Sequence, residues 1–356
     1  MPDALVTATS PAIEDVCRAV GPGDRVSARL SHVRQLTLAR PAGSLGHLDE
    51  VIHQIAAIRG QPAPEGPLPA LISVLAGDHG VAGHGTSVYR AGLTSTVFGL
   101  ILTGQAPVSI LARQAGARVA AADFGLLEPV GDQRYKVAPG TGDISREDAM
   151  TADQARQAIR NGIRYASDQL GGSQLVAVGE VGVGNTTATA ALAARLLSLP
   201  VAAVTGAGSG IGDATLSRKR DLVAAALQRT SDVPGDPVAL LAALGGYEIG
   251  GNVGVILAAA RQRRAVVLDG YISGVAALLA VRLCPSAREY LIAAHQSAEP
   301  GHPLVLAALG LRPLLALDLR LGMTSGAALA LSLINSTLAV AAQTPRALRV
   351  GLAEAT

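Results

Sequence analysis

The amino-acid sequence predicts an α/β protein, in which a parallel sheet flanked by helices is joined to a smaller helical subdomain. In the middle of the 356-residue chain, short apolar segments alternate with alanine-rich segments of helical character, which is the pattern of β-α-β units. These apolar segments end in glycine-rich or polar turns. The two ends of the chain lack the alternation, and their pattern is helical. We therefore expect both ends to build the subdomain.

Taken in order, residues 1–60 are expected to be helical, as in the segment from Asp49 to Arg59. Together with residues 312–356 they form the predicted small helical subdomain, and residues 61–311 form the α/β domain. Four apolar segments of that domain are expected to be strands, and the turns after them should line one cleft, because ligands gather beyond the carboxyl ends of parallel strands. The expected strands are 71–75, 175–178, 201–204 and 265–268, and the turns are 77–80, 179–180, 205–210 and 269–270.

The segment from Leu321 to Pro345 carries no charged residue and is long enough to span a membrane. It nevertheless contains several polar side chains, so we expect a buried helix and no membrane contact. These side chains are Thr324, Ser325, Ser332, Asn335, Ser336, Thr337 and Gln343.

The composition is typical of a soluble enzyme, with 49% hydrophobic and 16% charged residues. A net charge of +2 without a basic tract, 2% aromatic residues and no tryptophan argue against a nucleic-acid partner. Cys17 and Cys284 are too few and too far apart in the sequence for a disulfide framework or a zinc site. The chain opens with Met-Pro-Asp instead of a basic and apolar leader, so we expect a cytoplasmic protein.

The most informative segment is Gly-Glu-Val-Gly-Val-Gly-Asn-Thr-Thr at residues 179–187, where an apolar run leads through a glycine loop into an alanine-rich helix. Its glycines admit tight backbone geometry, and Asn185 or Thr186 can cap the helix. The free amides of such a helix start bind phosphate. Glu180 would repel an anion in this place, so we expect this carboxyl group to have a chemical task.

Asp78, His79 and His84 are close in the sequence, but no acidic cluster accompanies them, so we predict hydrogen-bonding loop residues and no metal. Residues 206–212 read Gly-x-Gly-x-Gly-x-Gly, which is not the spacing of a dinucleotide fingerprint. No dinucleotide cofactor is therefore expected.

Two further polar segments each have two interpretations. Residues 218–220, Arg-Lys-Arg, are either a solvated helix face or a source of one cation that turns back to a phosphate or carboxylate. The segment Glu-Pro-Gly-His at 299–302 is either a simple turn or, with Ser297, a source of polar groups for the cleft. Glu248 and Glu299 are expected to be scaffold residues.

The motifs, taken together, resemble those of nicotinate-nucleotide:dimethylbenzimidazole phosphoribosyltransferases, the CobT family of cobamide nucleotide-loop assembly. The likeness extends from about residue 25 to residue 350, and the motifs follow one another in one order. They are Gly-Asp-His-Gly-Val-Ala (77–82) with Ser-Val-Tyr (87–89), the segment 179–187, Leu-Ser-Arg-Lys (216–219), Gly-Gly-Tyr-Glu-Ile (245–249), Val-Leu-Asp-Gly-Tyr-Ile (267–272) and Ser-Ala-Glu-Pro-Gly-His (297–302).

The resemblance implies transfer of phosphoribose from nicotinate mononucleotide to a benzimidazole nitrogen, with inversion at the anomeric carbon and release of nicotinate. It also implies a homodimer, a Rossmann-like α/β domain and a small helical domain, without metal or redox cofactor. Glu180 matches a glutamate near the reacting ribose, and Lys219 matches a lysine after the glycine loop. The other implied site residues bind either the nucleotide (Gly182, Gly184, Asn185, Thr186, Thr187, Gly206, Gly208, Gly210 and Asp269) or the base (Ser87, Ser95, Leu321 and Met323).

The sequence departs from the family pattern near its C-terminal end. The pattern Arg-Leu-Gly-Glu-Gly-[Ser/Thr]-Gly-Ala has a glutamate that accepts the proton of the incoming base, whereas residues 320–327 read Arg-Leu-Gly-Met-Thr-Ser-Gly-Ala. Met323 cannot take a proton. General-base help contributes roughly a hundred- to ten-thousand-fold in rate, which is about 3 to 5.5 kcal/mol of barrier. A thioether makes the pocket more apolar and adaptable instead.

A second departure lies on the same side of the expected pocket. The family commonly has a glutamine where residues 94–97 read Thr-Ser-Thr-Val, and Arg90 stands where proline is usual. The sequence thus leaves three hypotheses: an active transferase that uses dimethylbenzimidazole or a related azole, a relative with a different acceptor such as another purine or a phenol, and a non-catalytic nucleotide-binding subunit.

Overall fold

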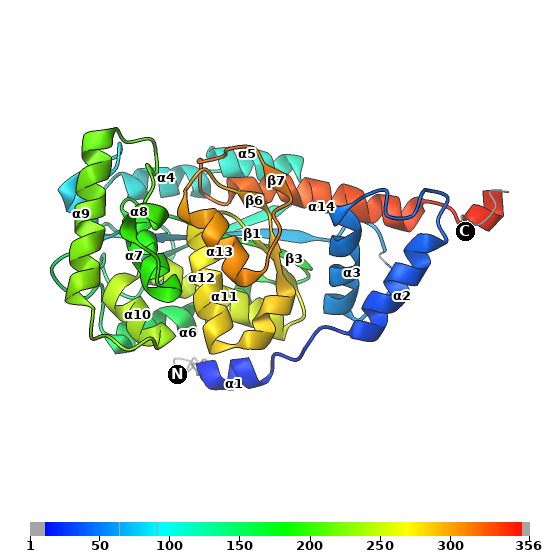
Figure 1. Ribbon diagram of the computed structural model, residues 1–356, viewed down its shortest axis with the longest axis horizontal. Coiled ribbons are helices and arrows are strands. Elements are labelled where there is room, and N and C mark those ends of the chain that lie inside the picture. Colours follow the sequence, from blue (N-terminus) through cyan, green and yellow to red (C-terminus); the bar gives the residue numbers. More distant parts are fainter. Residues whose placement is uncertain (1–10, 64, 91, 351–356) are drawn as a thin grey trace, which may run out of the picture.

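The centre of the protein is a five-stranded, fully parallel sheet in the order β2-β1-β3-β4-β5 (Figure 1). The computed structural model describes residues 11–63, 65–90 and 92–350. Every residue of β1 is buried, which is the pattern of a strand covered on both faces of a parallel sheet. The strands are β1 (Ala70–Gly77), β2 (Arg118–Gly125), β3 (Leu175–Val181), β4 (Ala265–Leu268) and β5 (Leu291–Ala293).

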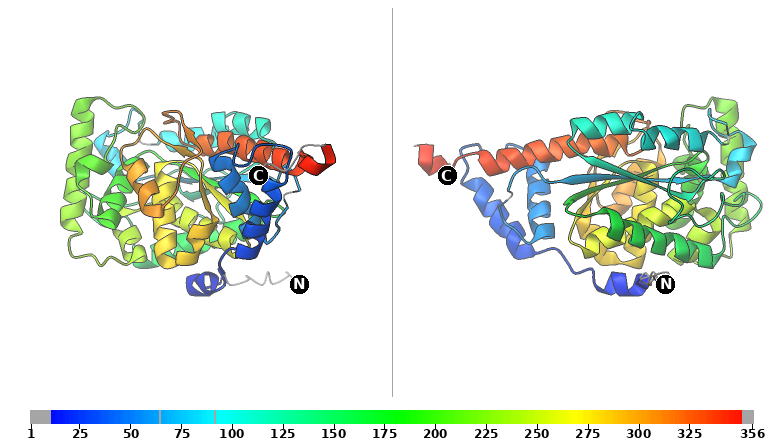
Figure 2. Two further views of the ribbon diagram at one scale, coloured as in Figure 1. Left: turned by 45° about the vertical axis from the view of Figure 1, so that its right-hand side comes forward. Right: turned by 180° about the vertical axis from the view of Figure 1, so that it is seen from behind.

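Helices cover both faces of this sheet, as Figure 2 shows from behind. One layer contains α4 (Leu93–Leu102), α5 (Pro107–Gln114) and α14 (Ser325–Gln343), and the other contains α6 (Ala152–Gln169), α11 (Tyr247–Arg261) and α12 (Tyr271–Leu283). The closest helix crossing, between α6 and α11, depends on small residues, because a Cβ atom at Gly162 would collide with the carbonyl of Gly251. A parallel, doubly wound α/β fold is therefore confirmed.

Further elements gather beyond the carboxyl ends of the strands, at the left of Figure 1. They are α7 (Asn185–Leu197), α8 (Val201–Val204), α9 (Asp213–Arg229) and α10 (Pro237–Leu244). A short 3₁₀ helix, η1 (Gly80–His84), follows β1. A separate small sheet pairs β6 (His295–Gln296) with β7 (Leu315–Ala316), and α13 (Gly301–Leu309) connects these two strands in the sequence. The loops next to these elements supply most of the walls of the site described below.

Three of the four predicted strands are confirmed as β1, β3 and β4, and the fourth is wrong. Residues 201–204 form the single helical turn α8 instead. Pro200 precedes this turn with a φ of −66°, and the two alanines inside it favour helix. An apolar run of four residues does not distinguish a buried strand from a buried helical turn.

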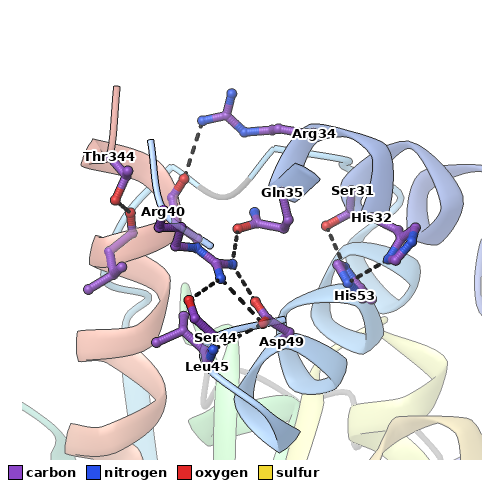
Figure 3. Close-up of polar contacts among 12 residues, drawn as sticks. Ser31, His32, Arg34, Gln35, Arg40, Ser44, Leu45, Asp49, His53 and Thr344 are labelled. Atoms are coloured by element: carbon purple, nitrogen blue, oxygen red, sulfur yellow. Dashed lines mark hydrogen bonds and ion pairs between the residues drawn. The ribbon is translucent and has the colours of Figure 1, made fainter. Parts of the chain in front are cut away.

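The first three helices are α1 (Ile13–Arg18), α2 (Arg25–Leu36) and α3 (His47–Arg59), so the predicted helical character of this part is confirmed. Of these helices, α2 and α3 stand to one side of the sheet, at the right of Figure 1, and α1 lies against α11 at the bottom of that view. Arg40 forms an ion pair with Asp49, and its guanidinium also donates to Gln35 (Figure 3). Because both side chains of the ion pair are largely shielded, this contact fixes the loop between α2 and α3.

The loop after α2 meets the segment after α14 beside α2 and α3. Leu38 pairs with Arg346 in an antiparallel bridge, and the amide of Ala39 donates to the carbonyl of Pro345 at 2.8 Å. Arg34 donates to the carbonyl of Ala341 in α14 (Figure 3). The hydrophobic core nevertheless continues from α3 into the sheet. The division into 1–60 with 312–356 and 61–311 stays a prediction, and its residues 1–10 and 351–356 lie outside the described part.

By length and composition alone, two segments of the described chain are apolar enough to cross a membrane, Leu93–Gln114 and Ser325–Gln343. The first consists of α4, α5 and the turn between them. The second is α14, which buries Ala330, Leu331 and Ile334 and packs on β3 and β4. The helix predicted within residues 321–345 is thus confirmed as part of the core.

Candidate active site

A cavity of about 230 Å³ opens at the carboxyl ends of β1, β3 and β4. The chain runs from β1 outward to β2 and then returns to β3 on the other side of β1. Such a reversal of strand order is where open α/β sheets bind ligands. The walls come from residues within the segments 86–97, 180–186, 208–209, 269–272, 295–299 and 319–323.

The floor of the cavity is the loop from β3 into α7. Gly184 precedes the helix with a φ of +95°, and a side chain there would press on His79 and Ala82. The helix start has no side-chain cap, so the prediction that Asn185 or Thr186 caps it is wrong. Among the described residues, the amides of Gly184 and Thr186 have no hydrogen-bond acceptor. The helix start is therefore available to an anion.

Glu180 is the last residue but one of β3 and is almost fully buried in the cavity wall. The side-chain amide of Asn185 donates to its Oε2 atom. Burial, together with the nearby carboxyl groups of Glu248 and Asp269, raises the pKa of Glu180 well above its ordinary value. The shift disfavours the charged carboxylate, so repulsion of an anion at the helix start would be weaker than for an ordinary glutamate.

Lys219 lies in α9 and is 1% exposed. Its Nζ atom donates to Thr186 Oγ1 at 2.9 Å and to the carbonyl of Gly206 at 3.0 Å. It thereby joins the start of α7 to the glycine loop. Burial lowers the pKa of Lys219, and the carboxylate of Glu299 opposes this shift. Within residues 218–220, Lys219 turns back into the protein, whereas Arg218 stays exposed. Contact of Lys219 with a phosphate or carboxylate stays a prediction.

The glycine loop at 206–210 follows α8 and is held from the opposite side by Glu299. The amide of Gly208 donates to Glu299 Oε1 at 2.6 Å. A Cβ atom at Gly206 would collide with Pro300, so this glycine permits the close approach of the two loops. This hydrogen bond is the scaffold contact that was expected of Glu299, and Glu299 and Ser297 also present polar groups to the cavity.

The opposite wall of the cavity is apolar and more open. Tyr89 and Leu321 are each about half exposed, at 53% and 52%, and Leu93 and Val97 line the same side. The hydroxyl of Ser87 lies 3.3 Å from the hydroxyl of Ser209. This wall presents flat apolar surface with few polar groups, which suits an aromatic ring.

Met323 is placed in this wall by an unusual backbone. Met323 and Thr324 both have a positive φ, of 56° and 62°. A β-branched residue in that conformation is a genuine outlier, with a cost of about 1 to 3 kcal/mol. Thr324 is fully buried and donates from Oγ1 to the carbonyl of Ser73 in β1 at 3.1 Å. This bond helps to hold the strained turn.

Asp269 follows β4 and supports the turn that contains Met323 and Thr324. Its Oδ1 atom accepts a hydrogen bond from the amide of Ala327 at 2.9 Å and lies 3.7 Å from His295 Nε2. Burial raises the pKa of Asp269, and the charge of His295 opposes this shift. The contacts made by Asp269 therefore anchor the start of α14.

Comparison with known proteins supports what this geometry indicates. A family model described as "Phosphoribosyltransferase" matches residues 20–347. The chain belongs to this phosphoribosyltransferase family. A relative from Chloroflexus aggregans is 45% identical over 90% of this chain and 92% of its own length, and one from Azotobacter vinelandii is 42% identical over 89% and 92%. Both are named nicotinate-nucleotide--dimethylbenzimidazole phosphoribosyltransferase.

Solved structures agree with the sequence relatives. The crystal structure of the nicotinate-nucleotide-dimethylbenzimidazole phosphoribosyltransferase of Thermus thermophilus superposes with a TM-score of 0.86 at 36% identity, covering 93% of this chain and 99% of that one. A second structure, of CobT from the same organism, has a TM-score of 0.87 at 37% identity, covering 92% and 99%. The resemblance deduced from the motifs is thus confirmed.

Most residues that the sequence suggested for this phosphoribosyltransferase site do line one cavity. They are Glu180, Gly182, Gly184, Asn185, Thr186, Gly208, Asp269, Ser87, Leu321 and Met323. Lys219, Thr187, Gly206 and Gly210 lie outside the lining, although Lys219 contacts it through Thr186. Ser95 also lies outside, with its hydroxyl 3.5 Å from the carbonyl of Glu128. The individual roles of all these residues stay predictions.

Sequence reasoning missed several residues of the wall. Tyr89, Thr94 and Arg320 stood inside segments that had been quoted for other reasons. Tyr271 also stood inside such a segment, whereas His295 reaches the cavity only through the tertiary fold. An aromatic or basic residue close to a predicted site residue is the signal that would have found Tyr89, Tyr271 and Arg320.

The turn after β1 does not line the cavity of the phosphoribosyltransferase, contrary to expectation. Asp78 accepts from the amide of Leu127 at 2.9 Å, His79 pairs with Glu248 at 2.7 Å, and both Asp78 and His79 are buried. His84 pairs with Asp143 at 2.7 Å. The prediction of hydrogen-bonding loop residues is confirmed, and the described residues hold no group of three or more His, Cys, Asp or Glu side chains arranged for a metal.

Proposed function

We propose that this protein transfers the phosphoribosyl group of nicotinate mononucleotide to dimethylbenzimidazole and releases nicotinate. The observation that carries this proposal is the pairing, in one cavity, of an anion site at the start of α7 with an apolar wall for a flat base. The product, an α-riboside phosphate, is the activated lower ligand of a cobamide.

The bond changes assign a task to each side of the cavity. A nitrogen of dimethylbenzimidazole forms a bond to C1′ of the ribose, the bond from C1′ to nicotinate breaks, and its electron pair passes to the pyridine nitrogen. The ring N–H proton of the base passes to solvent water in the same reaction. The amides of Gly184 and Thr186 and the ammonium of Lys219 bind the phosphate. Neutral Glu180 lies between phosphate and ribose without repelling either.

The acceptor lies against Tyr89, Leu93, Leu321 and Met323 in this proposal. Met323 adds polarizable apolar surface and takes no proton. Attack from this wall, opposite the departing nicotinate, inverts the anomeric carbon. Holding both reactants in one water-poor cavity supplies much of the rate.

We also infer a homodimer in the cytoplasm. The helix α2 exposes Val26, Leu30 and Val33, at 66%, 51% and 50%, along one face. Their spacing places them on a single stripe, and a contiguous apolar surface of this kind marks an interface. A second copy of the chain is its proposed occupant. Light scattering of the wild type and of Leu30→Asp tests this: a dimer that the substitution dissociates supports the proposal, and a wild-type monomer contradicts it.

Nicotinate release tests the function directly. Purified protein is incubated with nicotinate mononucleotide alone and with dimethylbenzimidazole, adenine or phenol. Release that requires dimethylbenzimidazole supports the proposal. Release only with another acceptor favours the relative with a different substrate, and tight nucleotide binding without release favours a non-catalytic subunit. The relatives, 45% and 40% identical over 90% and 85% of this chain, favour the first outcome.

A further inference from the structure

Arg320 is the one arginine or lysine among the described residues that line the cavity. The same lining includes the carboxyl groups of Glu180, Asp269 and Glu299. Arg320 is exposed, and within the described chain it takes part in no side-chain hydrogen bond or ion pair. Its guanidinium lies beside the glycine loop, because a Cβ atom at Gly210 would be 3.8 Å from Arg320 Nη1. A free cation thus stands in an otherwise acidic cavity.

The substrate named for the relatives carries two anionic groups, the 5′-phosphate and the carboxylate of the pyridine ring. The phosphate already has the start of α7 and Lys219, whose Nζ atom lies under Gly208. Gly210 lies two residues further along the same loop, and the guanidinium of Arg320 lies beside it. Ser209, between them, contributes a hydroxyl to this part of the lining. A planar guanidinium with a neighbouring hydroxyl matches a carboxylate.

We propose that Arg320 binds the pyridine carboxylate and thereby selects nicotinate nucleotides over nicotinamide nucleotides. This inference rests on the proposed function. A carboxamide is neutral and cannot form the ion pair, although it fits the same space. The contact also strengthens during the reaction, because the ring loses its positive charge as the bond to C1′ breaks, and the leaving group becomes a net anion. Arg320 therefore stabilises the transition state more than the bound substrate.

The test compares nicotinate mononucleotide with nicotinamide mononucleotide in wild type, Arg320→Gln and Arg320→Lys, with dimethylbenzimidazole as acceptor. We expect Arg320→Gln to lower kcat/KM for the nicotinate nucleotide at least about thirty-fold, since a hydrogen bond to a charged group is lost. The value for the nicotinamide nucleotide should stay within about threefold. Arg320→Lys keeps the positive charge but lacks the planar guanidinium, so its kcat/KM should lie between those of the wild type and Arg320→Gln. Arg312→Gln, at an exposed arginine outside the cavity lining, is the matched control.

Equal losses with both nucleotides would overturn the proposal, because Arg320 would then act on a group that they share, such as the phosphate. No loss with either would overturn it as well. If wild type does not turn over the nicotinamide nucleotide, inhibition by free nicotinate and free nicotinamide gives the same comparison. Should wild type release no nicotinate with any acceptor, the proposed function fails, and calorimetric binding of the two nucleotides still decides the role of Arg320.

Discussion

Replacing Lys219 by methionine is expected to lower activity strongly without destabilising the protein. The ammonium group is buried, and its two hydrogen bonds go to the start of α7 and to the glycine loop. Methionine has a similar length and no charge, so it fills the same space. The substitution therefore separates what the charge does for the phosphate from what the side chain does for the fold.

The expected magnitudes follow from these contacts. Each lost hydrogen bond from the ammonium costs about 1.5 to 3 kcal/mol, while the removed desolvation penalty of the buried charge is several kcal/mol. The two nearly cancel, so the free energy of unfolding should change by less than about 1.5 kcal/mol or rise. Loss of a charged contact to the phosphate costs about 3 kcal/mol, which is roughly a hundredfold or more in kcat/KM.

The same substitution changes the pH dependence of stability. Burial lowers the pKa of Lys219 below its ordinary value of 10.5. At a pH between the lowered pKa of the folded protein and the ordinary pKa of the unfolded chain, Lys219 is protonated only in the unfolded chain. The free energy of unfolding of the wild type therefore increases as pH rises through this interval. Methionine has no proton to release, and the variant should lack this gain. Urea unfolding at several alkaline pH values measures the difference.

Lys136, the other lysine of the chain, provides a matched control. It lies outside the cavity lining and pairs with the fully buried carboxylate of Asp123 at 3.2 Å. Lys136→Met leaves that carboxylate without its cation and should destabilise the protein by about 3 kcal/mol, with kcat/KM unchanged at a temperature where it is folded. A Lys219→Met variant that keeps more than a fifth of wild-type kcat/KM, or that loses more stability than Lys136→Met, would refute the reasoning.

Three further predictions concern the turn before α14 and the buried acid. Met323→Glu should raise turnover with dimethylbenzimidazole at least about tenfold, with Leu321→Glu as the control; no gain in a steady-state assay counts against a role for the missing base. Thr324→Val should lower the free energy of unfolding in urea by about 1 kcal/mol, because the bond to the Ser73 carbonyl is lost. Glu180→Gln should become more stable relative to the wild type as pH rises. The raised pKa of Glu180 gives the wild type a stabilising contribution to the free energy of unfolding that is present near pH 4 and is lost at higher pH. Equal pH profiles in urea unfolding would contradict this.

The fold was predictable where the apolar pattern was long and was bounded by glycine. The strands β1, β3 and β4 are fully buried or nearly so and end in glycine turns. The edge strand β2 is partly exposed at its start, and β5 has only three residues, so neither stands out by pattern. Residues 201–204 were misassigned because a run of this length fits both a strand and a helical turn.

The site was predictable where one continuous segment supplies it. The segment 179–187 contains the acid, the glycines and the helix start in a row. The burial of Lys219 and the support of the glycine loop by Glu299 depend instead on segments that only the fold brings together. The two cysteines show the same limit, since they are far apart in the sequence but adjacent in space, with Cys284 Sγ 3.6 Å from the carbonyl of Cys17.

The two sides of the cavity differ in how firmly they are built, and this difference fits the expectation that the sequence departs from the family pattern on the acceptor side. On the anion side, Glu180 and Lys219 are buried; Glu180 accepts a hydrogen bond from the start of α7, and Lys219 donates one to the glycine loop. A substitution there disturbs both the ligand and the scaffold. On the acceptor side, Tyr89 and Leu321 are half exposed and Met323 is only partly buried. Because exchanging such side chains costs little stability, the acceptor wall can change while the phosphate site stays intact.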